Sequence, residues 1–146
     1  MDTNGVYELL GGAPVNMNLS SFLDENVNTN WGPWTYRSIY LDSCGNPGAY
    51  ANENTTIFVQ GSADQYNMIN TLNWTPYTLF DGGVDQYKAY RNTYGTWESI
   101  PFEVFPDGTY TLTDDVSNLR NKGEVCYQIM ALENQNQFGF ADSSYS

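Results

Sequence analysis

Residues 91–115 read RNTYGTWESIPFEVFPDGTYTLTDD and contain the clearest strand and turn pattern in the chain. Two β-rich runs, at 96–105 and 109–113, flank the triplet Pro106-Asp107-Gly108. Proline presets the backbone φ and glycine accepts a positive φ, so this triplet favours a tight turn. We therefore predict a β-hairpin over these residues, with Pro101 marking an edge strand or a bulge.

Other segments extend the β pattern on both sides of this hairpin. Residues 35–42, TYRSIYLD, alternate as one strand, and residues 84–94 alternate likewise. Residues 124–133, EVCYQIMALE, are apolar on both faces apart from Gln128, which predicts a central strand. Weaker strands are expected at 56–61, 66–74 and 77–80, and a long loop over 44–56.

Two segments have the capping residues that are typical of the ends of short helices. Residues 20–27 offer a serine as N-cap with acids in the first turn. Residues 114–123 begin with two aspartates and end with Arg120 and Lys122 before Gly123.

Short strands at roughly 8–12-residue spacing point to an all-β sandwich or barrel. We predict a mainly β, single-domain antiparallel sandwich or barrel over residues 1–146, with one or two short helices. Residues 1–19 are expected to form an extended N-terminal arm and residues 138–146 a C-terminal tail. The apolar ends, Val6, Tyr7 and Leu9 with Phe138 and Phe140, suit docking on neighbouring subunits by strand addition.

The charge balance excludes one class of partner. The chain has 17 acids and five bases, a net charge of −12 and a pI near 4.1. Such a surface repels phosphate backbones, so nucleic acid is not expected as a partner. No basic start precedes an apolar run of signal-peptide length, and no run of about 18 apolar residues occurs. We expect neither export by that route nor membrane insertion.

The residue types present restrict the chemistry. The chain has no His, which removes Ser-His and Cys-His nucleophile pairs and imidazole metal sites. Cys44 and Cys126 have no metal-like spacing; we expect two buried or idle thiols, with a disulfide as the alternative. The oxygen-rich run 24–30 lacks the glycine and glutamate positions of an EF-hand loop.

Carboxylate chemistry is the remaining catalytic alternative, because a glycosidase needs only two acids about 5–10 Å apart. Glu98 and Glu103 are the obvious pair, yet they are an odd number of residues apart and would face opposite sides of a regular strand. A bulge at Pro101 could bring them together. We predict a non-enzymatic protein with no catalytic residue, no cofactor and no metal site.

The aromatic side chains beside turns indicate a function more strongly than the carboxylates do. Aromatic residues make up 16% of the chain, and all four tryptophans lie next to a predicted turn. Such rings fill cores, contact other proteins, or stack on sugar rings with Asn and Gln nearby, and these three alternatives stay open. The candidates for an interface or a glycan-facing surface are Trp31, Trp34, Trp74, Tyr90, Arg91 and Trp97.

The segment VDQYKAYRNTYGTWESIPF, residues 84–102, resembles knob-like modules of bacteriophage tail fibres and related bacteriocin fibres. In those modules a strand ending in an aromatic residue and Arg, here Tyr90-Arg91, leads through a short polar turn into Gly-Thr-Trp and a second strand. They often carry a second Trp soon afterwards, where this chain has Ile100-Pro101.

Few lysines, abundant Asn and Tyr and the absence of His also resemble the decoration and fibre proteins of tailed-phage virions. The resemblance implies a non-enzymatic virion protein made in the host cytoplasm, a capsid decoration or head-fibre component that assembles with other virion proteins, usually as a homo-oligomer. The alternative that it implies is a carbohydrate-binding receptor module of a tail fibre, with a surface glycan as partner.

Overall fold

The computed structural model describes residues 7, 23–104, 108–119, 124–135, 139 and 142–146. All regular elements of these residues are strands, and their pairs are antiparallel. The prediction of a mainly β antiparallel fold is therefore confirmed. The strands are β1 (Thr35–Tyr36), β2 (Ile39–Leu41), β3 (Pro47–Tyr50), β4 (Asn54–Thr55), β5 (Val59–Asp64), β6 (Ile69–Trp74), β7 (Val84–Thr93), β8 (Thr96–Val104), β9 (Thr111–Asp115), β10 (Cys126–Glu133) and β11 (Ser143–Tyr145).

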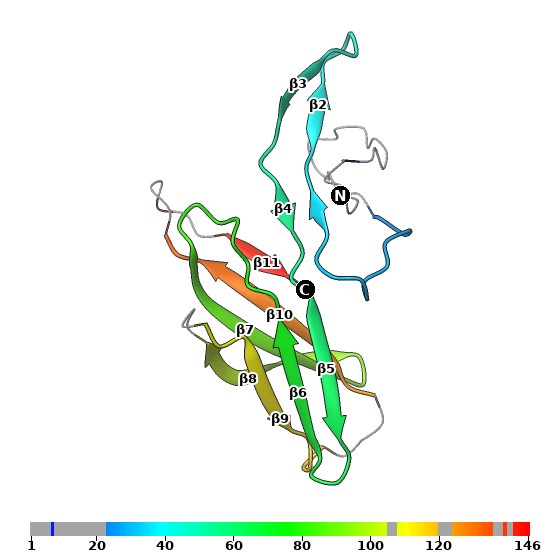
Figure 1. Ribbon diagram of the computed structural model, residues 1–146, viewed down its shortest axis with the longest axis vertical. Coiled ribbons are helices and arrows are strands. Elements are labelled where there is room, and N and C mark those ends of the chain that lie inside the picture. Colours follow the sequence, from blue (N-terminus) through cyan, green and yellow to red (C-terminus); the bar gives the residue numbers. More distant parts are fainter. Residues whose placement is uncertain (1–6, 8–22, 105–107, 120–123, 136–138, 140–141) are drawn as a thin grey trace.

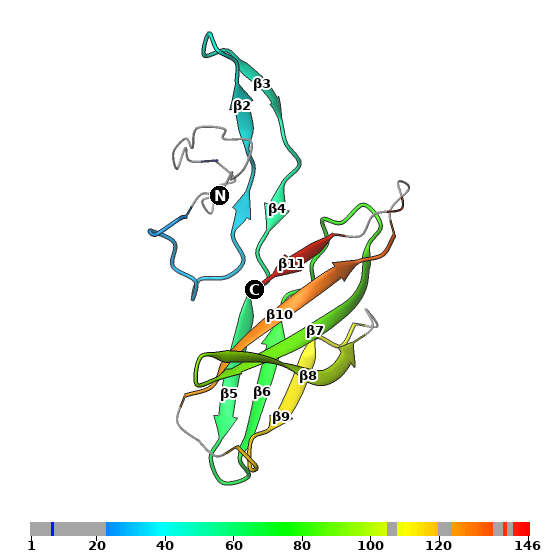
Figure 2. The same ribbon diagram turned by 180° about the vertical axis from the view of Figure 1, so that it is seen from behind.

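Two sheets face each other and form a sandwich (Figure 1 and Figure 2). One sheet has the strand order β11-β10-β7-β8 and the other the order β5-β6-β9. The sheets do not close into a barrel, so the sandwich is the architecture found. Strand β10 pairs with both β7 and β11, which confirms the central strand expected at 124–133.

The core lies between the two sheets because apolar side chains of both alternate inward. Ala89 and Ile129 are fully buried on the larger sheet, and Leu72 and Leu112 meet them from the smaller one. Aromatic rings fill the remaining space, and the Trp74 and Tyr87 ring centroids lie 5.8 Å apart. The buried cluster consists of Ile57, Leu72, Trp74, Tyr77, Tyr87, Ala89, Ile100, Leu112, Ile129 and Ala131.

The hairpin in this region differs from the predicted one. Strands β8 and β9 lie in different sheets and do not pair with each other, so the predicted hairpin is wrong. Pro106 and Asp107 lie outside the described residues. The hairpin joins β7 to β8 through Tyr94 and Gly95, whose φ values are 59° and 80°. Both turn residues have positive φ, as a two-residue hairpin turn requires.

The expectation for Pro101 is confirmed. Strand β8 is an edge of its sheet, and its register to β7 shifts next to this residue. Tyr90 pairs with Ser99, whereas Lys88 pairs with Glu103, so β8 carries two extra residues there. Proline fits this position because an irregular edge needs no continuous ladder of N–H donors.

Neither predicted helix is found in the described residues. Asp24 accepts a hydrogen bond from the backbone N–H of Asn26 at 3.1 Å, which forms a turn in place of a helical start. Residues 114 and 115 end β9, and only a turn follows at 117–118. Acidic residues next to Asn and Ser form such local turns as readily as helix caps. Residues 20–22 and 120–123 lie outside the described residues.

The strand predictions at 56–61 and 77–80 also need correction. Strand β5 starts later and passes Gly61, because pairing to β6 continues without a shift as far as Asp64. Residues 77–80 form no strand. Tyr77 instead turns into the core, where its backbone N–H donates to the Tyr87 hydroxyl at 2.8 Å.

Residues 34–56 leave the sandwich as a projecting two-stranded ribbon (Figure 1). It consists of the pairs β1–β4 and β2–β3. The predicted single strand at 35–42 is therefore interrupted, and the predicted loop at 44–56 contains two strands. Pattern analysis misses them because Pro47, Gly48 and Asn54 have low β-propensity, and cross-strand pairing overrides that preference.

Candidate functional site

The tip of the ribbon is a tight turn organised by one carboxylate. Oδ1 of Asp42 accepts the backbone N–H groups of Cys44 and Asn46, both at 2.8 Å. Oδ2 accepts the Asn46 side-chain amide at 2.9 Å. The bond from the Asn46 side chain is the main reason that the pKa of Asp42 is lowered. The carboxylate therefore fixes the turn, and Cys44 is exposed at the end of the ribbon.

The middle of the ribbon holds an arginine between two aromatic rings. Cζ of Arg37 lies 3.7 Å from the centroid of the Tyr7 ring and 4.2 Å from that of Tyr50. The Tyr7 hydroxyl donates to Oε1 of Glu53, and this bond raises the pKa of Tyr7. Cation–π contacts of this kind contribute about 0.5–1 kcal/mol each at exposed sites. They tie residue 7 to the ribbon of its own chain.

Large apolar side chains cover the outer part of the ribbon without being buried. Tyr40 and Leu41 are each 62% exposed, and Tyr50 is 60% exposed. The Tyr40 ring lies against Gly48, where a Cβ would overlap the ring atoms. The absence of a side chain at Gly48 thus lets Tyr40 lie flat across the ribbon. Exposed apolar side chains on one element make that element a candidate interaction surface.

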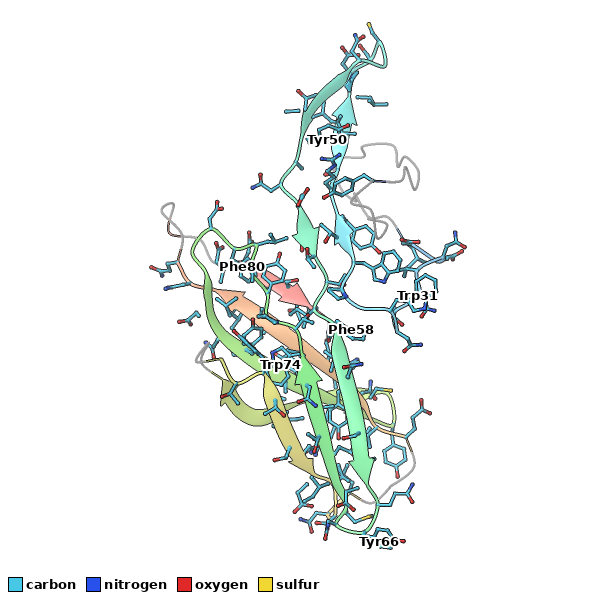
Figure 3. All side chains as sticks on the ribbon, in the orientation of Figure 1. Trp31, Tyr50, Phe58, Tyr66, Trp74 and Phe80 are labelled. Carbon is cyan, nitrogen blue, oxygen red and sulfur yellow. The ribbon has the colours of Figure 1, made fainter. Side chains whose placement is uncertain are left out.

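The loop before the ribbon presents one of the predicted tryptophans to solvent. Trp31 is 78% exposed and points away from the sandwich (Figure 3). Trp34 is half-buried, and its indole N–H donates to the carbonyl of Asn28 at 3.1 Å. Tyr36 donates to Oδ2 of Asp24 at 3.2 Å, and burial followed by this bond raises the pKa of Tyr36. Of these aromatics, Trp31 is the free surface group.

The other predicted interface residues divide between the core and the sandwich surface. Trp74 is buried and part of the core, so it cannot face a partner or a glycan. Tyr90 is half-buried. Trp97 is 48% exposed on β8 and pairs with Asn92. Trp31 and Trp97 thus come from separate elements, and the six candidates do not form one site.

Arg91 has a different role, because it joins the two sheets. Its Nε donates to Oε1 of Glu98 at 2.8 Å, and its Nη1 donates to both Asp114 oxygens at 2.9 and 3.0 Å. The Tyr127 hydroxyl donates to Oδ2 of Asp114 at 2.9 Å and accepts the Asn70 amide at 2.6 Å. Burial is the main cause that raises the pKa of Tyr127 to about 12. Sequence pattern gave no signal for this network, since its members are far apart in the chain.

The carboxylates considered for catalysis are held in place by these contacts. Glu98 and Asp114 bind the same guanidinium. Glu103 pairs through its backbone with Lys88, three residues along β7 from the Arg91 partner of Glu98. The side chain of Glu103 lies outside the described residues. The acid that does lie near Glu98 is Asp114, and both carboxylates form ion pairs with Arg91. The absence of a catalytic residue stays a prediction.

A second buried carboxylate closes the far end of the larger sheet. Glu133 is 5% exposed, and its two oxygens accept the backbone N–H groups of Gly82 and Asp142 at 3.0 and 3.1 Å. The side chain therefore ties two loops to the end of β10. This contact is structural.

Several expectations concern groups that the structure places elsewhere or does not describe. We expected two buried or idle thiols, with a disulfide as the alternative. Both cysteines are free, as the first expectation has it, but they are exposed and not buried. Val6, Leu9, Phe138 and Phe140 lie outside the described residues. No group of three or more metal-binding side chains occurs in the part of the chain that the structure describes. Nor does any helix within these residues have the length and apolar character to span a membrane.

Comparison with known proteins gives no relative: no family model, no curated protein and no solved structure matches the chain.

Proposed function

We propose that the chain is a non-enzymatic structural protein of a bacteriophage particle, a capsid decoration or head-fibre component located in the virion. It assembles there with other virion proteins through the projecting ribbon at 34–56. The observation that carries the proposal is the exposure of Tyr40, Leu41 and Tyr50 together on an element that stands away from the core. An isolated two-stranded ribbon is marginally stable in water, and a partner surface would stabilise it.

The charge of the ribbon supports the same proposal. Residues 34–56 contain one base, Arg37, and two acids, Asp42 and Glu53, which gives −1 within a chain of −12. A nearly neutral, aromatic-rich surface can be buried without a large desolvation cost. The acidic sandwich then stays in solvent, where its charge keeps the chain soluble.

Co-sedimentation with phage particles assembled without this chain tests the proposal. The parent chain is expected to sediment with the particles, and the double variant Tyr40→Ser with Leu41→Ser is expected to stay in the supernatant. Tyr66→Ser is the matched control, because Tyr66 is 99% exposed at the opposite end of the molecule (Figure 3). Equal binding of the double variant and the control would contradict the assignment to the ribbon.

A carbohydrate-binding role is the second candidate, and the exposure of Trp97 beside Asn92 favours it. An exposed indole stacks on the apolar face of a sugar ring while a neighbouring amide bonds its hydroxyls. A glycan array separates the two roles. Binding that is lost in Trp97→Ala and kept in the ribbon variant would support a receptor module.

A further inference from the structure

The four sheet edges of the sandwich differ in how they are protected. Strand β11 has only three residues, β8 contains Pro101 and a register shift, and β9 ends in two aspartates. Strand β5 has six residues in continuous register with β6, contains neither proline nor lysine, and has one charged residue, Asp64 at its end. Short length, bulges, prolines and charges are the features that block pairing at an edge. Strand β5 is therefore the edge most open to another strand.

The hydrogen bonds next to β5 show which of its groups point outward. The carbonyl of Phe58 accepts the N–H of Thr75 at 3.0 Å, so residue 58 points toward β6. Because this direction alternates along an antiparallel strand, the N–H and C=O groups of Val59, Gly61 and Ala63 point away from β6. Hydrogen bonds among the described residues include none to these outward groups.

We propose that β5 pairs with β5 of a second copy of this chain. The two strands run antiparallel with Gly61 opposite Gly61 at the two-fold axis, and Val59 of each copy lies opposite Ala63 of the other. This register forms about six inter-strand hydrogen bonds from the outward groups. It joins two three-stranded sheets into one continuous sheet.

The side chains of β5 fit this register. Gly61 leaves the axis free of side chains. Ala63 lines a groove of about 230 Å³ whose wall is half apolar and half polar, so Val59 of the second copy would meet apolar side chains there beside polar ones. The other lining residues are Met68, Val116 and Val125, which are apolar, and Asp64, Gln65 and Asn70, which are polar. The charge also permits the contact, because the two Asp64 carboxylates would lie roughly 20 Å apart. That separation exceeds the Debye length of about 8 Å at physiological salt.

The pairing goes beyond the virion role and does not depend on it. The ribbon and β5 are different elements, so a dimer could form in a protein of any function. Their tests are separate as well. A monomeric β5 variant that still sediments with particles would leave the ribbon proposal intact, and a dimer that ignores particles would leave the β5 pairing intact.

Sedimentation velocity of the full chain over a wide concentration range tests the pairing. The parent is expected to associate to twice the 16.5 kDa mass of one chain. Gly61→Pro removes the outward N–H at the axis without breaking a bond to β6, so this variant is expected to be monomeric. Gly61→Ala is the control: its Cβ would lie 3.4 Å from Leu72, an ordinary contact, and it keeps the N–H. Circular dichroism and thermal unfolding establish that both variants fold.

A parent that stays monomeric at every concentration, or a folded Gly61→Pro variant as dimeric as the parent, would overturn the proposal.

A charge pair tests the register. Gln60 and Ser62 are exposed and lie opposite each other across the axis. Gln60→Lys with Ser62→Lys places like charges together and is expected to weaken the dimer about tenfold. This weakening is expected even though the variant reduces the negative net charge of each chain from −12 to −10, which by itself would favour association. Gln60→Lys with Ser62→Glu keeps −12 and is expected to restore it. A stronger dimer in the Lys/Lys variant would contradict this register.

Discussion

The ribbon and the sandwich are both made of short antiparallel strands, yet they are stabilised in different ways. In the sandwich, Ile129 and Ala89 are fully buried between two sheets. In the ribbon, Tyr40 and Leu41 are more exposed than buried, and the tip depends on the hydrogen bonds of Asp42. The sandwich is held by a core, whereas the ribbon is held by pairing, turn bonds and the rings around Arg37.

Because of this difference, buried residues of the sandwich determine the stability of the isolated chain, and exposed residues of the ribbon determine the binding of a partner. A buried apolar residue contributes to the free energy of folding in the isolated chain. An exposed apolar residue contributes little there and becomes stabilising only when a partner covers it. Substitutions in the two regions should therefore have opposite effects on stability and on binding.

The largest expected effect is in the core. Ile129→Ala should lower the free energy of unfolding by about 2–5 kcal/mol, because the site is enclosed and cannot collapse around the cavity. Leu41→Ala on the ribbon should change it by no more than about 0.5 kcal/mol. Urea unfolding followed by tryptophan fluorescence measures both. Equal losses would mean that the ribbon belongs to the same cooperative core.

The network around Arg91 should give the next largest effect. Asp114→Ala leaves the guanidinium and the Tyr127 hydroxyl without their shared acceptor. We expect a loss of about 2–3 kcal/mol, below the range for a fully buried pair because the Arg91 side chain keeps 16% exposure. Asp85→Ala, an exposed acid on β7, is the control in the same denaturation experiment.

Alkaline pH should weaken the sandwich through Tyr127. Its pKa is about 12 in the folded chain against 10.0 for an ordinary tyrosine, so the unfolded chain loses this proton first as pH rises. The stabilisation is complete below pH 10 and is lost between about pH 10 and 12. Tyr127→Phe should show a shallower decline of unfolding free energy than the parent over that window. Parallel declines would contradict the raised pKa.

The smallest effect on overall stability is expected at the ribbon tip. Asp42→Ala removes three hydrogen bonds from an exposed turn, so the melting temperature should hardly change while the amides of residues 44–46 exchange faster. The lowered pKa of Asp42 means that acid should have the same local effect as its carboxylate becomes protonated. A parent that retains its protection at low pH would argue against this role of the carboxylate.

The sandwich could be predicted from sequence where hydrophobic pattern decides pairing. Strands β7 and β10 have strong alternation or continuous apolar character, so the positions of both were predictable, as was the central location of β10. The sheet to which each strand belongs was not, because a turn signal such as Pro106-Asp107-Gly108 does not specify the strand with which the next one pairs. The Arg91–Asp114 pair likewise depends on packing between sheets, and no local spacing encodes it.

The ribbon was harder to predict because its strands lack a buried face. With little core contact, alternation is not selected, and residues such as Pro47 and Gly48 interrupt the pattern. The burial of the aromatic candidates was equally hard to predict. Proximity to a turn did not distinguish buried Trp74 from exposed Trp31.

Hydrogen exchange measured by mass spectrometry, on the free chain and on the chain bound to phage particles, tests the central claim most directly. The account predicts that ribbon peptides covering 36–55 exchange rapidly in the free chain and become protected on the particle. Peptides from β7 and β10 should be protected in both states, because their bonds lie in the core sheet. Ribbon peptides that exchange equally fast in both states would contradict the claim that this surface makes the contact.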